Sequence, residues 1–173
     1  MKDGFTYQGG ELDVMGGSFG RIQGSAQWGK QVEGFAVYGA LEGLHEKGFR
    51  NFATSDVRRF YGDVGYRSDS SEFHLNMGVA NNKFGASATV PVELLQQNYG
   101  ATYTTPQTSN NRVGYLNFTG KVEATPTWTV EAAAHLRFFR NKTQDGNPTG
   151  TQPCEDPTLL CFGDDDTPAN GLN

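Results

Sequence analysis

Short stretches of the chain alternate apolar and polar residues with a period of two. In residues 72–79 the apolar side chains are Phe73, Leu75, Met77 and Val79, and the positions between them are mostly polar. Because successive side chains of an extended strand point to opposite faces, this alternation predicts a strand with one apolar face. The pattern predicts seven strands, near residues 11–18, 21–29, 35–44, 58–67, 72–81, 113–124 and 128–140.

The connections between the expected strands alternate in length as well. Residues 30–34, 68–71 and 125–127 are short turns, whereas residues 45–57 and 82–112 are long connections. The first hairpin, at residues 19–21, departs from this order. Short turns at one end of the strands and long loops at the other are typical of outer-membrane β-barrels.

Large aromatic residues on the apolar face gather next to the short turns. They are Trp28, Phe35, Tyr66, Phe73 and Trp128. In a barrel they would form a belt at the periplasmic boundary between water and lipid, where amphipathic rings are favoured. We therefore expect an all-β fold, an antiparallel up-and-down transmembrane β-barrel of which about seven strands are present. The alternative is a soluble sandwich or barrel whose core is filled by these rings.

The composition narrows the classes of protein further. The 173 residues include 23 glycines, and only 36% are hydrophobic, which disfavours a compact helical core. No apolar run approaches the roughly 18 residues of a membrane helix. The first residues lack the apolar region of a signal peptide, so we expect no secretion signal in this chain. The net charge of −5 argues against nucleic acid as a partner.

The polar positions of the strands supply the candidate functional side chains. In a barrel they would line the lumen and face a plug, and we expect most of them to pair across strands. The candidates are Arg21, Gln23, Gln27, Glu42, Arg59, Asp63, Arg67, Glu72, His74, Lys121, Glu123, Glu131, His135 and Arg137.

The remaining candidates for chemistry are few. Cys154 and Cys161 lie close together in the final segment and are expected to form a disulfide in an oxidising compartment. The three histidines have no metal-ligand spacing, so neither a metal nor a cofactor is expected. No nucleophile elbow or paired-carboxylate motif is present, and we expect the chain not to be an enzyme.

Five segments together resemble the first strands of a TonB-dependent outer-membrane receptor. They are GGSFGR at 16–21, FAVYGALE at 35–42, RRFYGDVGYR at 58–67, EFHLNMG at 72–78 and PVELLQQ at 91–97. The resemblance implies a parent protein with a barrel of about 22 strands, closed by an N-terminal plug. Such receptors import scarce nutrients such as ferric siderophores, with energy relayed by the inner-membrane TonB complex.

The resemblance also implies how the chain is organised. We expect residues 1–140 to hold the first barrel strands and residues 141–173 to be a truncated extracellular loop. The parent would lie in the bacterial outer membrane, in contact with its lipid. Its missing parts would supply the plug domain and the contact with the TonB complex, and its ligand would be a ferric siderophore or a similar small molecule. The alternatives are a passive porin-like barrel and a soluble all-β binding module.

Overall fold

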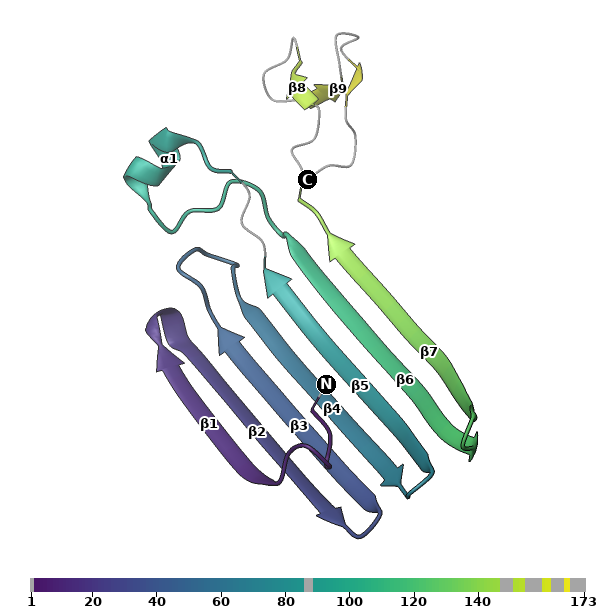
Figure 1. Cartoon of the computed structure of the whole chain (residues 1–173). Coiled ribbons are helices and arrows are strands. Elements are labelled where there is room, and N and C mark those ends of the chain that lie inside the picture. Colours follow the sequence, from purple (N-terminus) through teal and green to yellow (C-terminus); the bar gives the residue numbers. More distant parts are fainter. Residues whose placement is uncertain (1, 86–88, 147–150, 155–159, 163–166, 169–173) are drawn as a thin grey trace.

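The chain forms one large antiparallel sheet in which every strand pairs with the next (Figure 1). The structure is a computed structural model that describes residues 2–85, 89–146, 151–154, 160–162 and 167–168. The seven strands are β1 (Gly9–Gly17), β2 (Arg21–Val32), β3 (Phe35–Glu46), β4 (Ser55–Arg67), β5 (Ser71–Gly85), β6 (Thr108–Thr125) and β7 (Trp128–Gln144). The predicted up-and-down antiparallel sheet is confirmed. The sheet is open rather than a closed barrel, and β1 and β7 are its edges.

Most strands are longer than the sequence pattern predicted. β6 begins at Thr108 instead of residue 113, and β7 continues to Gln144, beyond the expected boundary at residue 140. At this end polar residues stand opposite one another, such as Asn111 and Asn141. The backbone ladder continues there because its hydrogen bonds do not depend on the alternation of side chains.

The connections at one end of the sheet are all short turns, whereas two of the three at the other end are long. Glu33 and Gly34, residues 68–70 and residues 126–127 make the turns at one end. The other end carries the single turn η1 (Ser18–Gly20) and the longer connections 47–54 and 86–107. We call this second end the long-loop end. The connection 86–107 contains α1 (Val92–Gln97), a helix that the all-strand prediction missed because six residues are too few to show a helical period.

The two faces of the sheet differ in character. The register places Leu75 opposite Phe118, and Phe118 opposite Ala134, on a face that is apolar over most of its area. Large side chains on this face are open, with Leu12 at 75% exposure, Leu136 at 70% and Leu75 at 40%. These side chains are therefore not packed between two stacked sheets, as the soluble sandwich alternative requires.

A second, smaller sheet follows β7. It has the strand order β10-β9-β8 and is built from β8 (Thr151–Pro153), β9 (Leu160–Phe162) and β10 (Thr167–Pro168). Cys154 and Cys161 are joined by a disulfide, and their Cα atoms are 5.2 Å apart. The sequence pattern predicted no strands here.

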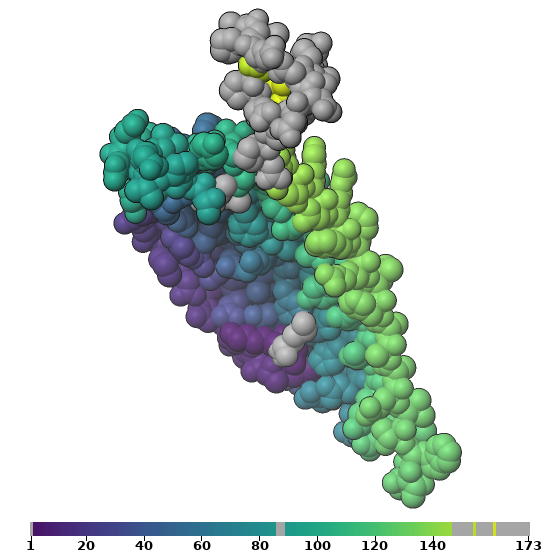
Figure 2. Space-filling view, turned by 90° about the horizontal axis from the view of Figure 1, so that it is seen from above, coloured from purple at the N-terminus to yellow at the C-terminus, as the bar shows by residue number. Residues whose placement is uncertain are grey.

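Residues 2–8 fold back over the polar face of the large sheet (Figure 2). The ring of Phe5 meets the ring of His74 edge-on at 5.7 Å, and the ring of Tyr7 meets that of Tyr38 at 5.6 Å. The backbone N–H of Gln31 donates a hydrogen bond of 2.9 Å to the side chain of Gln8. We call residues 2–8 the N-terminal segment.

Two glycines of the sheet allow this close approach. A Cβ atom on Gly29 would lie 2.3 Å from the carbonyl oxygen of Tyr7, and one on Gly65 would lie 2.5 Å from the ring of Phe5. Both distances are shorter than a van der Waals contact, so only glycine leaves room at these positions.

We predict that Gly29→Ala loosens the N-terminal segment, because the new methyl group displaces the backbone of Tyr7. Limited proteolysis should cleave the variant within residues 2–8 at least about tenfold faster than the wild type, since local opening governs cleavage. Gly43→Ala is the matched control, because a Cβ atom there meets no atom within 4 Å. Equal cleavage of the two variants would contradict the prediction.

Candidate functional site

The polar face of the large sheet carries all the predicted polar candidates. The residues that share this face are Arg21, Gln23, Gln27, Glu42, Arg59, Asp63, Arg67, Glu72, His74, Lys121, Glu123, Glu131, His135 and Arg137. Direct cross-strand neighbours include Glu42 and Arg59. Their shared face follows from the period-two geometry of paired strands. Whether the face lines a lumen stays a prediction.

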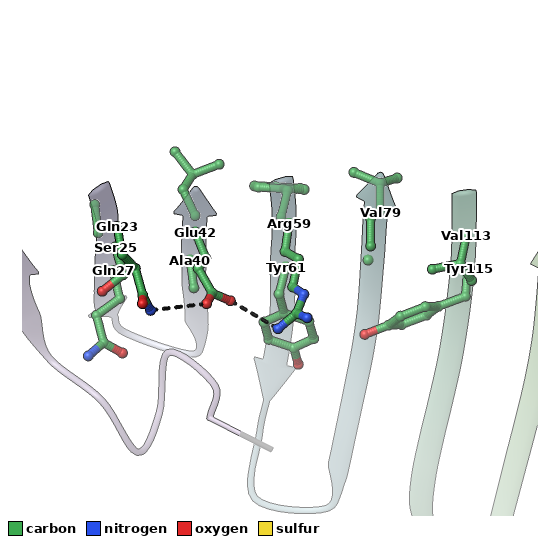
Figure 3. Close-up of a pocket in the computed structure, with 15 residues that line it drawn as sticks. Gln23, Ser25, Gln27, Ala40, Glu42, Arg59, Tyr61, Val79, Val113 and Tyr115 are labelled. Atoms are coloured by element: carbon green, nitrogen blue, oxygen red, sulfur yellow. Dashed lines mark hydrogen bonds and ion pairs between the residues drawn. The ribbon is translucent and has the colours of Figure 1, made fainter. Parts of the chain in front are cut away.

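A chain of polar side chains crosses the middle of this face (Figure 3). Gln23 donates a hydrogen bond of 3.5 Å to one carboxylate oxygen of Glu42, and the guanidinium of Arg59 lies 3.2 Å from the other. The three side chains line a hollow of about 540 Å³ with the rings of Tyr61 and Tyr115. Such a hollow offers donors, acceptors and aromatic edges to a polar ligand.

A denser ionic cluster lies beside the N-terminal segment. The Nδ1 atom of His74 is 3.0 Å from the carboxylate of Asp63, and its Nε2 atom is 3.1 Å from Glu72. Arg67 bonds Glu72 through two nitrogens, at 3.0 and 2.9 Å. The guanidinium of Arg67 also lies 4.2 Å from the centre of the Phe5 ring. A paired and hydrogen-bonded arrangement of this kind holds charges that are partly removed from water.

Asp63 is the most buried member of this cluster, with 3% of its surface exposed. Ala36 and Tyr38 are also buried, and Tyr38 touches the N-terminal segment through Tyr7. Much of the burial on the polar face therefore lies beside that segment, while Val57 is buried at the long-loop end.

The other candidates make smaller local contacts. Arg21 pairs with Glu46 at 3.2 Å, and Lys121 pairs with Glu131 at 3.7 Å. Gln27 accepts a hydrogen bond of 2.7 Å from the Tyr38 hydroxyl. His135 contacts Asn117, and Arg137 lies over the Phe139 ring at 5.7 Å. The backbone N–H of Glu123 donates a hydrogen bond of 2.8 Å to the Ser70 carbonyl, which joins β6 to the turn before β5.

The aromatic residues predicted to form a belt lie on the opposite, apolar face. Trp28, Phe35 and Trp128 are more than half exposed. The rings of Phe35 and Tyr66 are 4.8 Å apart, and Phe73 stacks on Phe118 at 6.2 Å. The five residues predicted to form the belt occupy the end of the sheet with the short turns. A membrane boundary at this level stays a prediction.

The sequence reading missed several members of the site. Tyr61 and Tyr115 line the central hollow, and Glu46 holds Arg21. Tyr61 stands between Arg59 and Asp63 at the same parity, so the alternation itself contained the signal. The contacts of Phe5 with His74 and Arg67 join residues far apart in sequence, and no local pattern indicates them.

Comparison with known proteins adds no relative. No protein-family model, curated protein or solved structure matches this chain. Among the described residues, no group of three or more His, Cys, Asp or Glu side chains is placed to hold a metal ion. The helices within that part of the chain include none long and apolar enough to cross a membrane. The polar face, with its hollow and its ionic cluster, is the candidate site.

We predict that Asp63→Ala destabilises the sheet far more than Glu131→Ala. Removal of Asp63 takes away the partner of the Nδ1 atom of the partly buried His74, whose Nε2 atom keeps Glu72, and should cost about 2–3 kcal/mol of unfolding free energy. Glu131 belongs to an exposed pair with Lys121, and such pairs contribute about 0–1 kcal/mol. Urea unfolding of both variants in detergent micelles measures the difference. Equal destabilisation would contradict the buried role of Asp63.

A pH dependence is expected at the start of the N-terminal segment. The Asp3 carboxylate accepts hydrogen bonds of 2.9 Å from the backbone N–H groups of Phe5 and Thr6. Partial burial raises the pKa of Asp3, but the hydrogen bonds from Thr6 and Phe5 and the nearby His74 outweigh it and lower the pKa.

Because the folded-state pKa lies below that of the unfolded chain, near 3.9, this turn is stabilised above about pH 4. The stabilisation should disappear as the pH falls through the lowered pKa. Amide NMR shifts of Phe5 and Thr6 should therefore titrate with a midpoint below about 3.9. Asp3→Ala should remove this titration, and a midpoint above the ordinary value would contradict the prediction.

Proposed function

We propose that the chain is part of the barrel wall of a TonB-dependent outer-membrane receptor, an active transporter of scarce nutrients. The observation that carries this proposal is that the apolar face of the sheet is the more open one and the polar face the better covered. Its apolar face is open across the strands, while its polar face holds paired charges and is partly covered by the N-terminal segment. A sheet with one apolar face needs an apolar partner, and lipid is the partner of such a face in a membrane barrel.

The height of the apolar band supports a membrane setting. Trp128 and Phe138 lie ten residues apart on the same face of β7, and every residue of that face between them is apolar. At about 3.3 Å per residue and a strand tilt of about 40°, this distance corresponds to about 25 Å along the membrane normal. Outer-membrane barrels have an outward apolar band of about that height.

The open edges support the proposal that further strands complete the wall. β1 and β7 each expose one row of backbone N–H and C=O groups. Within lipid every unpaired group costs several kcal/mol, so additional strands must satisfy these edges. In the proposed receptor the parent protein supplies those strands and the plug.

The proposal also gives the polar face a partner. In the parent barrel this face lines the lumen, and its ionic pairs face the plug domain, through which the TonB complex supplies energy. A ferric siderophore is the first choice of cargo, with cobalamin, oligosaccharides and other metal chelates next. Selectivity would lie in residues 82–112 and 141–173 and in the plug. A passive porin-like barrel shares the two-faced sheet, but the resemblance of the five sequence segments favours the receptor.

We predict that the full gene, but not this chain alone, restores growth of a receptor-deleted strain under iron limitation. Transport needs a gated plug, and insertion needs a closed sheet. The DNA on both sides of the reading frame should encode a plug upstream and more strands downstream. Rescue by the chain alone would contradict the proposal. Failure of the full gene on iron would remove siderophores as cargo and leave the transporter class standing.

Two neighbouring substitutions in the full gene test which face meets lipid. Met77 lies on the apolar face and Asn76 on the polar face of the same strand. Met77→Lys should cost about 2–4 kcal/mol near the bilayer midplane and lower the amount of receptor in the outer membrane, measured by immunoblot. Asn76→Lys is the matched control and should leave that amount nearly unchanged. The reverse order would contradict the assignment of faces.

A further inference from the structure

A band of cations interrupts the apolar face at the long-loop end of the sheet. Arg58 stands opposite Asn81, and Arg112 stands between Asn81 and Arg140 in the same cross-strand row. Two residues farther toward the long loops, Lys83 and Lys142 add positive charge to the same face. We call this set the cationic rim: Arg58, Lys83, Arg112, Arg140 and Lys142.

The cationic rim differs from the cations of the polar face. On that face Arg59 and Arg67 each pair with a carboxylate. The rim cations make no ion pair within the part of the chain that the structure describes. Of the carboxylates in β1–β7, only Asp56 shares this face; it stands opposite Lys83 but binds the Nδ1 atom of His45 at 2.7 Å. The rim therefore carries an excess of positive charge in a chain whose net charge is negative.

A groove joins the rim to the apolar band. Its volume is about 350 Å³, and it is lined by the apolar side chains of Leu41, Phe60 and Val79 together with Arg58 and Arg112. The register places these three apolar residues in one cross-strand row and Arg58 and Arg112 in the next row on the same face. One end of the groove thus suits a hydrocarbon chain, and the other end suits an anion.

A second hollow continues the rim along its length. It measures about 280 Å³ and is lined by Asn110, Arg112, Arg140 and Lys142. Guanidinium groups bind phosphate oxygens with paired hydrogen bonds, and an ammonium group adds a point charge. The two hollows share Arg112, so the cationic surface is continuous from β4 to β7.

We propose that the cationic rim binds the phosphate-bearing headgroups of anionic lipids, with an acyl chain lying along Leu41, Phe60 and Val79. The inference rests on the proposed membrane position of the apolar face. An arginine on a lipid-facing surface costs several kcal/mol at the bilayer midplane but almost nothing at the interface, so these residues belong at headgroup level. Anionic headgroups then supply the counter-charges that the described strands do not.

The test measures how much phospholipid remains with the purified protein encoded by the full gene. This protein is prepared in nonionic detergent micelles doped with either phosphatidic acid or phosphatidylcholine, and co-eluting lipid phosphate is measured after gel filtration. Wild type should retain phosphatidic acid about tenfold better than phosphatidylcholine, and about 0.5 M NaCl should abolish the preference by screening.

Matched double variants locate the binding surface. Arg112→Gln with Arg140→Gln removes two charges from the apolar faces of β6 and β7 and should abolish the preference. Lys121→Gln with Arg137→Gln removes two charges from the polar faces of the same strands and should preserve it. Arg112→Lys with Arg140→Lys keeps the charge and should retain most of the binding. Far-UV circular dichroism checks that each variant is folded. If the Arg112→Gln, Arg140→Gln variant is not folded, the salt dependence of the wild type decides whether the rim binds anionic lipid.

The outcomes separate the inference from the function on which it rests. Equal retention of the two lipids, equal loss in both glutamine variants, or salt-independent binding would contradict lipid binding by the cationic rim. None of these results would contradict the proposed membrane position of the sheet. Displacement of the lipid by millimolar inorganic phosphate would identify a free-phosphate site instead and also overturn the proposal. Retention of neither lipid would contradict both the rim and the contact of the apolar face with lipid.

Discussion

The structure depends on one continuous cross-strand register that runs from β1 to β7. Each strand pairs with the next in antiparallel order, and because side chains alternate with a period of two, this register alone decides which residues share a face. A slip of one residue in any strand would move its charges among the apolar side chains. The central hollow, the ionic cluster and the cationic rim all combine side chains from several strands, so all three depend on the same register.

Packing on the polar face adds a second constraint, which is local. The sheet has little core of its own, and its best-shielded residues lie beside the N-terminal segment, except Val57 at the long-loop end. Gly29 and Gly65 let the N-terminal segment approach the backbone, and Asp63 and His74 satisfy each other beneath it. Order at this place therefore comes from a short peptide resting on a sheet, rather than from a core between two layers.

Sequence reasoning succeeded where the signal was local. The period-two pattern predicted the strands and the common face of residues such as Glu42, Arg59 and His74, because successive side chains of a strand point to opposite faces. The short turns predicted the strand order. It failed for α1, which has under two helical turns, and for the strands beyond β7. It also began the sixth strand at residue 113, which left Arg112 outside and hid the cationic rim. The contacts of Phe5 are long-range and have no counterpart in any local pattern.

The open edges have a topological consequence. In an up-and-down sheet, odd-numbered strands all run in one direction, so β1 and β7 are parallel to each other. If the sheet curled and closed on itself, its seam would be a parallel pair between a strand of 9 residues and one of 17. A ring that is antiparallel throughout needs an even number of strands. Any wholly antiparallel closure that includes this sheet must therefore add an odd number of strands to it.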